Sequence, residues 1–285
     1  MVYRIIFIAA ITVLVLGALA PTSRMVGQMK AEEVVARHLE SIGPAQARAA
    51  VTTRIIAGIS QVMFRTPPPG QAVGRAVLAS EGTKTLIGMS FPSPVYPREQ
   101  LGFNGHSFVA AYSTPGVRSA LGSFLMTHDL IFKQGLMGGT LSSAWPLLDL
   151  TSRNPRLEYA GTKELDHYKM HELKYLPKGG SDLRISLFFD SDTFRHRRTE
   201  YERVIPASIG SRDYVNVQER EIRFKMVEQF SHFRLVNGLT LPHIYKIKLS
   251  VDSTGGTFLA DWEITLTQFT FNEKIDPNSF SISGG

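Results

Sequence analysis

Apolar and polar residues alternate with a period of two over most of the chain from residue 54 onward. Residues 182–190, DLRISLFFD, show the pattern most clearly. Asn104-Gly105 and Asn237-Gly238 separate such stretches, and this dipeptide tolerates the positive φ angles of tight hairpins. The chain therefore predicts a mainly β (α+β) fold, an antiparallel sheet of about ten or eleven strands that curves into an unclosed barrel or half-barrel. In 182–190 one face of the strand would carry Leu183, Ile185, Leu187 and Phe189.

A first helical pattern precedes the strands, in residues 31–43, AEEVVARHLESIG. Glu32 and Glu33 suit the positive end of the helix dipole, and Gly43-Pro44 ends the segment. Its apolar stripe, expected to face the core, consists of Val34, Val35, Leu39 and Ile42.

A second helical pattern interrupts the strands at residues 115–134. The stretch around it, GVRSALGSFLMTHDLIFKQGLMGG, is apolar and rich in Phe, Leu and Met. We expect Thr114 to cap this helix, Pro115 to take its first position and Gly135 to end it.

This apolar helix has two interpretations. It is part of the core, as apolar helix stripes usually are, or it is a lid over a bound apolar molecule. Met126 suits adaptable contact with an irregular ligand, and glycines at both ends suit a segment that moves. The glycines are Gly116, Gly135, Gly138 and Gly139.

The first 28 residues have the pattern of an export signal. Arg4 precedes an uncharged apolar run from Ile5 to Ala20, which is short for a membrane span of about 20 residues. The small residues before Pro21 suit cleavage, whereas the proline opposes it, so an uncleaved anchor is the alternative. We predict a signal peptide or N-terminal anchor at 1–28, one domain at 29–285, and a periplasmic location, free or tethered to the inner membrane by the leader.

Composition narrows the function classes. The absence of cysteine excludes disulfides, thiolate chemistry and a lipid attached to a cysteine after the leader. The net charge is +6, and two of the cations, Arg4 and Arg24, lie in the leader, which carries no acid. The remaining net charge of +4 is mild and is compatible with weak attraction to an anionic membrane surface. Nucleic acid is not an expected partner, because no basic helix or known motif is present.

No convincing active site emerges, so we expect neither catalysis nor a cofactor. Ser107 in GHSF resembles part of a nucleophile elbow, but position 109 is valine and the segment lies at a predicted hairpin. His167 and His171 would stand about 13 Å apart on a strand, too far to share a metal. We interpret both as surface histidines.

Charge concentrates in DSDTFRHRRTEY, residues 190–201. Asp190 and Asp192 would need a pocket and shifted pKa values to act as an acid–base pair. The favoured interpretation is a polar turn followed by a strand with a solvated basic face. Contact of RHRR with an anionic head group or an acidic partner is the functional alternative.

Three phrases, LFFDSDTFRHRRTEY, FRLVNGLTLP and FTFNEKIDPNSF, resemble turns and strands of the LolA/LolB-like proteins, the periplasmic carriers of outer-membrane lipoproteins and their relatives. The resemblance covers roughly residues 30–281. It implies an unclosed barrel whose concave face is covered by helices, with residues 115–134 as part of the lid. Carriers of the LolA type have an Arg-Pro pair after an early strand, whose arginine secures the lid, and the comparable stretch here, ASEGTKT, has none.

The resemblance implies non-catalytic binding of lipid or lipoprotein acyl chains in an apolar cavity, as in a lipoprotein-sorting carrier. An envelope sensor or protein-interaction scaffold is the alternative, with an envelope membrane protein as partner, and a hydrolase is the third hypothesis. We expect a monomer. Predicted lining residues of the acyl cavity and lid are Met89, Phe91, Leu121, Phe124, Leu125, Leu187, Phe189, Phe224, Met226, Ile247 and Trp262.

Overall fold

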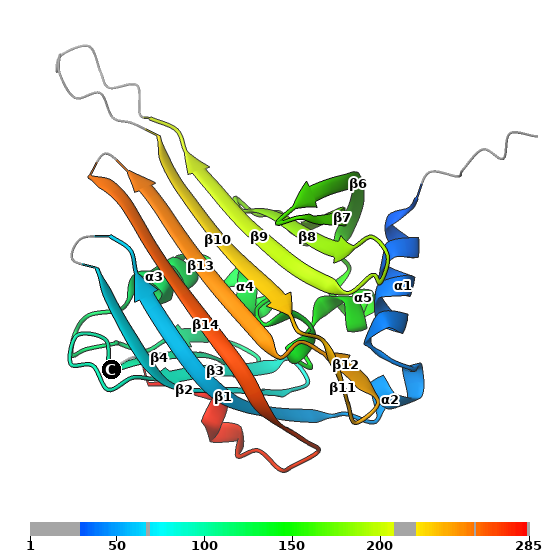
Figure 1. Cartoon of the computed structure of the whole chain (residues 1–285), viewed down its shortest axis with the longest axis horizontal. Coiled ribbons are helices and arrows are strands. Elements are labelled where there is room, and N and C mark those ends of the chain that lie inside the picture. The colour runs from blue at the N-terminus through cyan, green and yellow to red at the C-terminus, as the bar shows by residue number, and fades with distance from the viewer. Residues whose placement is uncertain (1–28, 67–68, 208–220, 254, 284–285) are drawn as a thin grey trace, which may run out of the picture.

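The computed structural model describes residues 29–66, 69–207, 221–253 and 255–283, so the predicted leader at 1–28 lies outside the described residues. Within these ranges, twelve strands form one antiparallel sheet in the order β5-β4-β3-β2-β1-β14-β13-β10-β9-β8-β7-β6. Figure 1 shows the long central strands curving past the helices α3 and α4, which lie behind them. The edge strands β5 and β6 stand at opposite ends of this order, so the barrel is unclosed.

The strands follow the alternating stretches of the sequence. The N-terminal group is β1 Thr53–Phe64, β2 Gly70–Glu81, β3 Lys84–Ser90, β4 Arg98–Phe103 and β5 Phe108–Ala110. The C-terminal group is β6 Arg156–Leu165, β7 Tyr168–Leu176, β8 Arg184–Asp190, β9 His196–Ile205, β10 Ile222–Ser231, β13 Ile244–Ser253 and β14 Gly256–Phe271. A separate ribbon joins β11 Arg234–Val236 to β12 Leu239–Leu241 through Asn237 and Gly238, which have φ angles of 53° and 81°.

The predicted fold class is confirmed, but the structure has more strands than the sequence pattern predicted. The described chain has twelve strands in the main sheet and two in the ribbon, against the ten or eleven expected.

The helices are short and lie mostly in two places. The predicted N-terminal helix is confirmed as α1 Ala31–Ile42, which buries Val34, Val35 and Ile42, and it is followed by α2 Ala45–Ala49. The others lie in the connection between the two edge strands, residues 111–155, here called the covering segment. It contains α3 Ala120–Thr127, α4 Leu130–Lys133, η1 Gly139–Leu141, η2 Pro146–Leu148 and α5 Leu150–Arg153, and η3 Pro277–Phe280 follows β14.

The covering segment links β5 to β6 and so runs from one edge of the sheet to the other. Alternation decides which side chains it meets. In β10, for example, Met226, Glu228 and Phe230 on the inner face are at most 2% exposed, whereas Val227 and Gln229 on the opposite face are 6% exposed and half-buried, respectively. The covering segment therefore lies over much of the concave face, together with α1 and the stretch after β3.

The single helix predicted at 115–134 is wrong in its start and its continuity. Thr114 and Val117 exchange backbone hydrogen bonds around Pro115-Gly116, with Gly116 at a φ of 76°, so this dipeptide makes a turn rather than a helix start. Proline followed by glycine is itself a turn signal, and here it outweighs the proline preference of a first helical turn.

The helix begins later and breaks once. Ser119 caps α3 by accepting a hydrogen bond from the Gly122 backbone N–H at 2.8 Å. His128 ends α3 with φ −120° and ψ 49°, and α4 follows as a separate turn. The predicted stop at Gly135 is confirmed by its φ of 70°.

Gly74 lets the chain cross the inner face of β2. A Cβ atom at this position would lie 1.8 Å from the Ser90 carbonyl oxygen. The close approach brings the stretch after β3 under the sheet, where Phe91 and Tyr96 are buried. Their rings then pack near Trp262, with 6.5 Å between the Tyr96 and Trp262 centroids.

Replacing Gly74 by alanine should therefore destabilise the protein. We expect Gly74→Ala to lower the free energy of unfolding by about 2 kcal/mol or more, because a backbone carbonyl has to move. Gly88→Ala is the matched control, since its Cβ would meet only the Val77 side chain at 3.3 Å. It should change stability by less than about 1 kcal/mol in the same urea titration. Equal losses in both variants would contradict the crossing as the cause.

Candidate functional site

The eleven residues predicted to line the cavity lie together in one hydrophobic cluster. Ten of them are buried and Phe224 is half-buried. Leu121 and Leu125 of α3 have no exposed surface and pack into the same cluster as Ile247 of β13. The structure thus shows α3 packed as part of the core, and its movement as a lid stays a prediction.

An apolar opening of about 310 Å³ lies where α3 meets the ends of β9, β10 and β13. Phe124 of α3 and Phe224 of β10, two of the predicted residues, stack across it with ring centroids 6.3 Å apart. Ile205 and Val251 add aliphatic surface. The remaining lining residues are Ala120, Ser123, Thr127, His128 and Arg203.

One residue of β9 that lines this opening, Arg203, is charged. Arg203 pairs in register with Phe224, and its guanidinium lies 3.1 Å from the Asp182 carboxylate. The His128 ring lies 3.8 Å from the same carboxylate. Burial lowers the pKa of His128, Asp182 raises it and Arg203 lowers it again, so the histidine is disfavoured as a cation.

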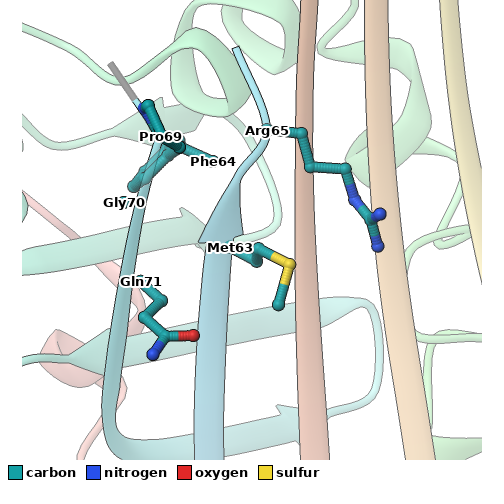
Figure 2. Close-up of a pocket in the computed structure, with 6 residues that line it drawn as sticks. All are labelled: Met63, Phe64, Arg65, Pro69, Gly70 and Gln71. Atoms are coloured by element: carbon teal, nitrogen blue, oxygen red, sulfur yellow. The ribbon is translucent and has the colours of Figure 1, made fainter. Parts of the chain in front are cut away.

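A second hollow, of about 490 Å³, lies at the far ends of β1 and β2 and is drawn in Figure 2. Figure 2 shows Phe64 and Arg65 pointing away from each other. Phe64 packs edge-on against Tyr96, with centroids 5.2 Å apart, and Arg65 pairs with Asp261 of β14 at 2.6 Å. Both side chains already have partners within the fold.

The covering segment is fastened to the sheet by buried polar groups. Glu99 of β4 is 2 % exposed and accepts a hydrogen bond from the Tyr96 hydroxyl at 2.6 Å, and the Trp262 indole donates to that hydroxyl at 2.9 Å. Burial raises the pKa of Glu99 to about 7, against hydrogen bonds from Ser119 and Tyr96 that lower it. Ser119 caps α3, so Glu99 lies directly beneath the start of that helix.

Glu228 of β10 makes a second buried attachment. Its carboxylate accepts hydrogen bonds from the Tyr201 and Tyr245 hydroxyls, at 2.7 and 2.5 Å, and from the Gly138 backbone N–H at 2.8 Å. Complete burial raises its pKa to about 7, and these three hydrogen bonds lower it. Since Gly138 belongs to the covering segment, the charge state of Glu228 bears on how that segment is held.

Arg54 of β1 makes a third buried attachment between the sheet and the covering segment. It is 2 % exposed and donates through Nη1 to the Thr140 carbonyl at 2.5 Å. Burial lowers its pKa to about 10, and its Nε atom has no hydrogen-bond partner in the described part of the chain. The Arg-Pro pair that the resemblance implies is missing near residue 80, yet an arginine from another strand contacts the covering segment.

A histidine and a tryptophan tie α1 to the same segment. The Trp145 indole donates to His38 Nε2 at 3.0 Å, which leaves His38 Nδ1 to donate to the Phe194 carbonyl at 3.0 Å. Burial lowers the pKa of His38 to about 4. His196 stacks on Trp145, and burial lowers its pKa as well, so this aromatic cluster holds two neutral histidines.

The residues weighed as catalytic candidates take structural roles. Asn104 Oδ1 accepts hydrogen bonds from the His106 and Ser107 backbone N–H groups in the turn between β4 and β5. This is the hairpin turn expected there. His167 is exposed as predicted, but His171 is buried, bonded to the Tyr159 hydroxyl at 3.0 Å and stacked on Phe194. The surface interpretation of His171 is therefore wrong.

Asp190 belongs to a polar turn, as favoured from sequence. Its carboxylate accepts hydrogen bonds from the Thr193 backbone and hydroxyl and from Arg197 Nε. Arg198 pairs with Asp166 and Glu200, so the basic residues of this strand are neutralised within the fold rather than solvated alone.

The described part of the chain has no group of three His, Asp or Glu side chains placed to hold a metal ion. In the same residues no helix is both long and apolar enough to cross a membrane.

The sequence reasoning missed Glu99, Glu228, Arg54 and Arg203. Each is a charged residue at an inward-facing position of its strand. This interruption of the alternation is a signal: in IRFKMVEQF, Glu228 falls on the face of Phe224, Met226 and Phe230.

Comparison with known proteins gives fold-level similarity alone. No family model matches the chain, and no curated protein does. Among solved structures it is similar to a DUF1329 family protein from Desulfovibrio piger, with 10% identity, a TM-score of 0.46 and coverage of 87% of this chain and 96% of that chain. It is also similar to a LolA superfamily protein from Nitrosomonas europaea, with 12% identity, a TM-score of 0.46 and coverage of 88% and 97%. These values carry no information about a ligand.

Glu228 makes the stability of the protein depend on pH. Its folded-state pKa, about 7, lies above its ordinary value of 4.5, so the stability that it contributes is complete below pH 4.5 and is lost as the pH rises through 7. The shift corresponds to about 3 kcal/mol. Glu228→Gln stays neutral, so its unfolding free energy relative to wild type should rise by about that amount between pH 4.5 and pH 8.

Urea unfolding at several pH values measures this difference. The other buried titrating groups, Glu99 and His38 among them, are present in both proteins and cancel. Glu263→Gln, which removes a carboxylate on the outer face with a side chain 42% exposed, is the control, and an equal rise in this variant would contradict burial of Glu228 as the cause. A flat difference for Glu228→Gln would mean that folding does not raise the pKa of this carboxylate.

Proposed function

We propose that this chain is an exported, non-catalytic protein that binds the acyl chain of a lipid or lipoprotein in the cell envelope. The observation that carries the proposal is the apolar opening between α3 and β9, β10 and β13. It is the place where residues predicted for the lid and for the sheet, Phe124 and Phe224, meet at the surface.

The opening has the size and chemistry for one end of an alkyl chain. Its volume of about 310 Å³ is at the lower end of the range of roughly 300–1,000 Å³ for small-molecule sites. Its walls are largely aromatic and aliphatic. Burial of each methylene contributes about 0.8 kcal/mol, so roughly ten methylenes would supply about 8 kcal/mol before the cost of ordering the ligand.

A longer chain would need space that α3 now fills. Leu121 and Leu125 of α3 are fully buried in the core cluster, so we infer that entry beyond the opening requires α3 to move outward. Gly116 and Gly138, at φ angles of 76° and 80°, flank the segment that would move. Its contacts with the sheet are apolar side chains plus a few buried hydrogen bonds, and an acyl chain replaces the apolar part.

A protein-interaction scaffold using a sheet edge is less well supported. The edge strand β6 carries Arg156, Glu158, Lys163 and Glu164, and its register shifts at Tyr159/Gly161. Charges and a bulge are the features that prevent an edge from pairing with another strand. The binding proposal therefore rests on the cavity and not on the edge.

Export belongs to the proposal as well, either free or tethered by the leader, with the leader pattern of residues 1–28 as its support. In this view the protein is a periplasmic carrier in lipoprotein sorting or a related envelope pathway, acting as a chaperone for an acyl chain.

Filling the opening should block binding. Val251→Trp places an indole between Phe224 and α3, and we expect it to weaken the neutral apolar probe N-phenyl-1-naphthylamine at least tenfold by fluorescence titration. Leu259→Trp, on the outer face of β14 and 37% exposed, is the matched control and should bind as wild type does. If wild type fails to bind the probe, or Val251→Trp binds it unchanged, the opening is not the acyl site.

Tying α3 to β5 should separate short ligands from long ones. A Cβ atom at Gly122 would lie 3.3 Å from Ala110 Cβ, close to the roughly 3.5–4.5 Å of a disulfide, and the chain has no other cysteine. Oxidised Ala110→Cys/Gly122→Cys should bind octanoate as its reduced form does and hexadecanoate at least tenfold more weakly. Dithiothreitol should restore hexadecanoate binding.

The two single cysteine variants control for crowding against Glu99, whose carboxylate lies 3.1 Å from the new Cβ. They should not respond to oxidation. Hexadecanoate binding that survives in the oxidised double variant would show that α3 stays in place when ligand enters.

A further inference from the structure

Arg203 stands on the concave face of the sheet, where every near neighbour in register is uncharged. Thr199 and Tyr201 precede it on the same face of β9, both buried, and Ile205 follows it. Across the strand pair it faces Phe224. An arginine beside this apolar surface is partly removed from water and is stabilised by a counter-charge.

The counter-charge now present is Asp182, and the pair is not enclosed. Arg203 is 28% exposed and Asp182 is 55% exposed. Asp182 precedes β8 and follows Gly179 and Gly180, whose φ angles are 98° and 84°. Asp182 therefore lies in a turn before β8 rather than within the strand.

The neighbouring pair on the outer face shows the difference. Arg184 and Glu202 face each other in adjacent positions of β8 and β9, 3.1 Å apart, with Arg184 70% exposed. That pair is an ordinary surface ion pair of little energetic weight. Arg203 differs because it lines the apolar opening, and it is the one formally charged residue at neutral pH among the described residues that line it.

We propose that this opening takes amphiphiles with an anionic head group, a carboxylate or a phosphate ester, whose charge pairs with Arg203 in place of Asp182. The proposal rests on the acyl-binding function and adds the class of head group. The planar guanidinium presents two parallel N–H donors that match either anion. The alkyl chain then lies against Phe124 and Phe224, so the two ends of one ligand meet the two chemistries of one opening.

The test compares ligands with equal chains and different heads. Decanoate, decyl phosphate and decanol displace N-phenyl-1-naphthylamine from wild type and from Arg203→Gln, Asp182→Asn and Arg184→Gln. We expect wild type to favour both anions over decanol at least tenfold. Arg203→Gln should lose this preference while it binds decanol within twofold of wild type.

Asp182→Asn should bind the anions several-fold more tightly than wild type, because it removes the competing carboxylate, and Arg184→Gln should behave as wild type does. If Arg203→Gln folds poorly, the tighter binding of anions expected for Asp182→Asn still tests the proposal. Inorganic phosphate at the concentrations used for decyl phosphate should displace nothing, because binding needs the chain as well.

Three results would overturn the head-group assignment. They are equal affinity of wild type for decanol and decanoate, equal loss of both in Arg203→Gln, and displacement of the probe by inorganic phosphate alone. In the first two cases acyl binding itself stands if decanol binds wild type. Failure of all three amphiphiles to bind would instead overturn the proposed function.

Discussion

The fold depends on covering the concave face of an open sheet. Twelve strands curve without closing, so one face of apolar side chains would meet water unless another element lay over it. The chain meets this requirement with the connection between its own two edge strands. Because β5 and β6 stand at opposite ends of the sheet, their connection crosses the sheet, and its apolar side chains pack into the core on the concave side.

The covering segment is helical without being strongly helix-forming. α3 has eight residues and α4 has four, lengths at which an isolated helix is not stable in water. Its place is determined by burial of Leu121, Phe124 and Leu125 and by hydrogen bonds to buried charged groups of the sheet. Those groups, Glu99, Glu228 and Arg54, come from three different strands, so the segment is located at points spread along its length.

The sequence predicts the sheet well because alternation and turn chemistry are local. Asn237-Gly238 makes the hairpin it favours, and the stripe Val34, Val35 and Ile42 is buried as expected. The start of α3 is missed because Pro115-Gly116 satisfies two local rules, a helix start and a turn, and tertiary contacts decide between them.

The site is partly predictable for the same reason. Alternation places the predicted lining residues on common faces, but only the fold shows which face is concave. Alternation also cannot predict which groups the buried charged residues contact. Glu228 meets Gly138 across 90 residues of chain, and Arg54 meets Thr140 across 86, so their roles exist only once the covering segment crosses the sheet.

In the proposed function, the ligand and α3 compete for the same apolar surface on the concave face of the sheet. An acyl chain that replaces Leu121 and Leu125 restores the burial lost when the helix moves out, so the apolar terms nearly cancel. The difference between the closed and the occupied states then depends on the polar contacts. Outward movement gives up the Ser119 contact of Glu99, and an anionic head group gains Arg203. A few polar contacts at the edges of an apolar exchange would therefore decide which state the half-barrel adopts.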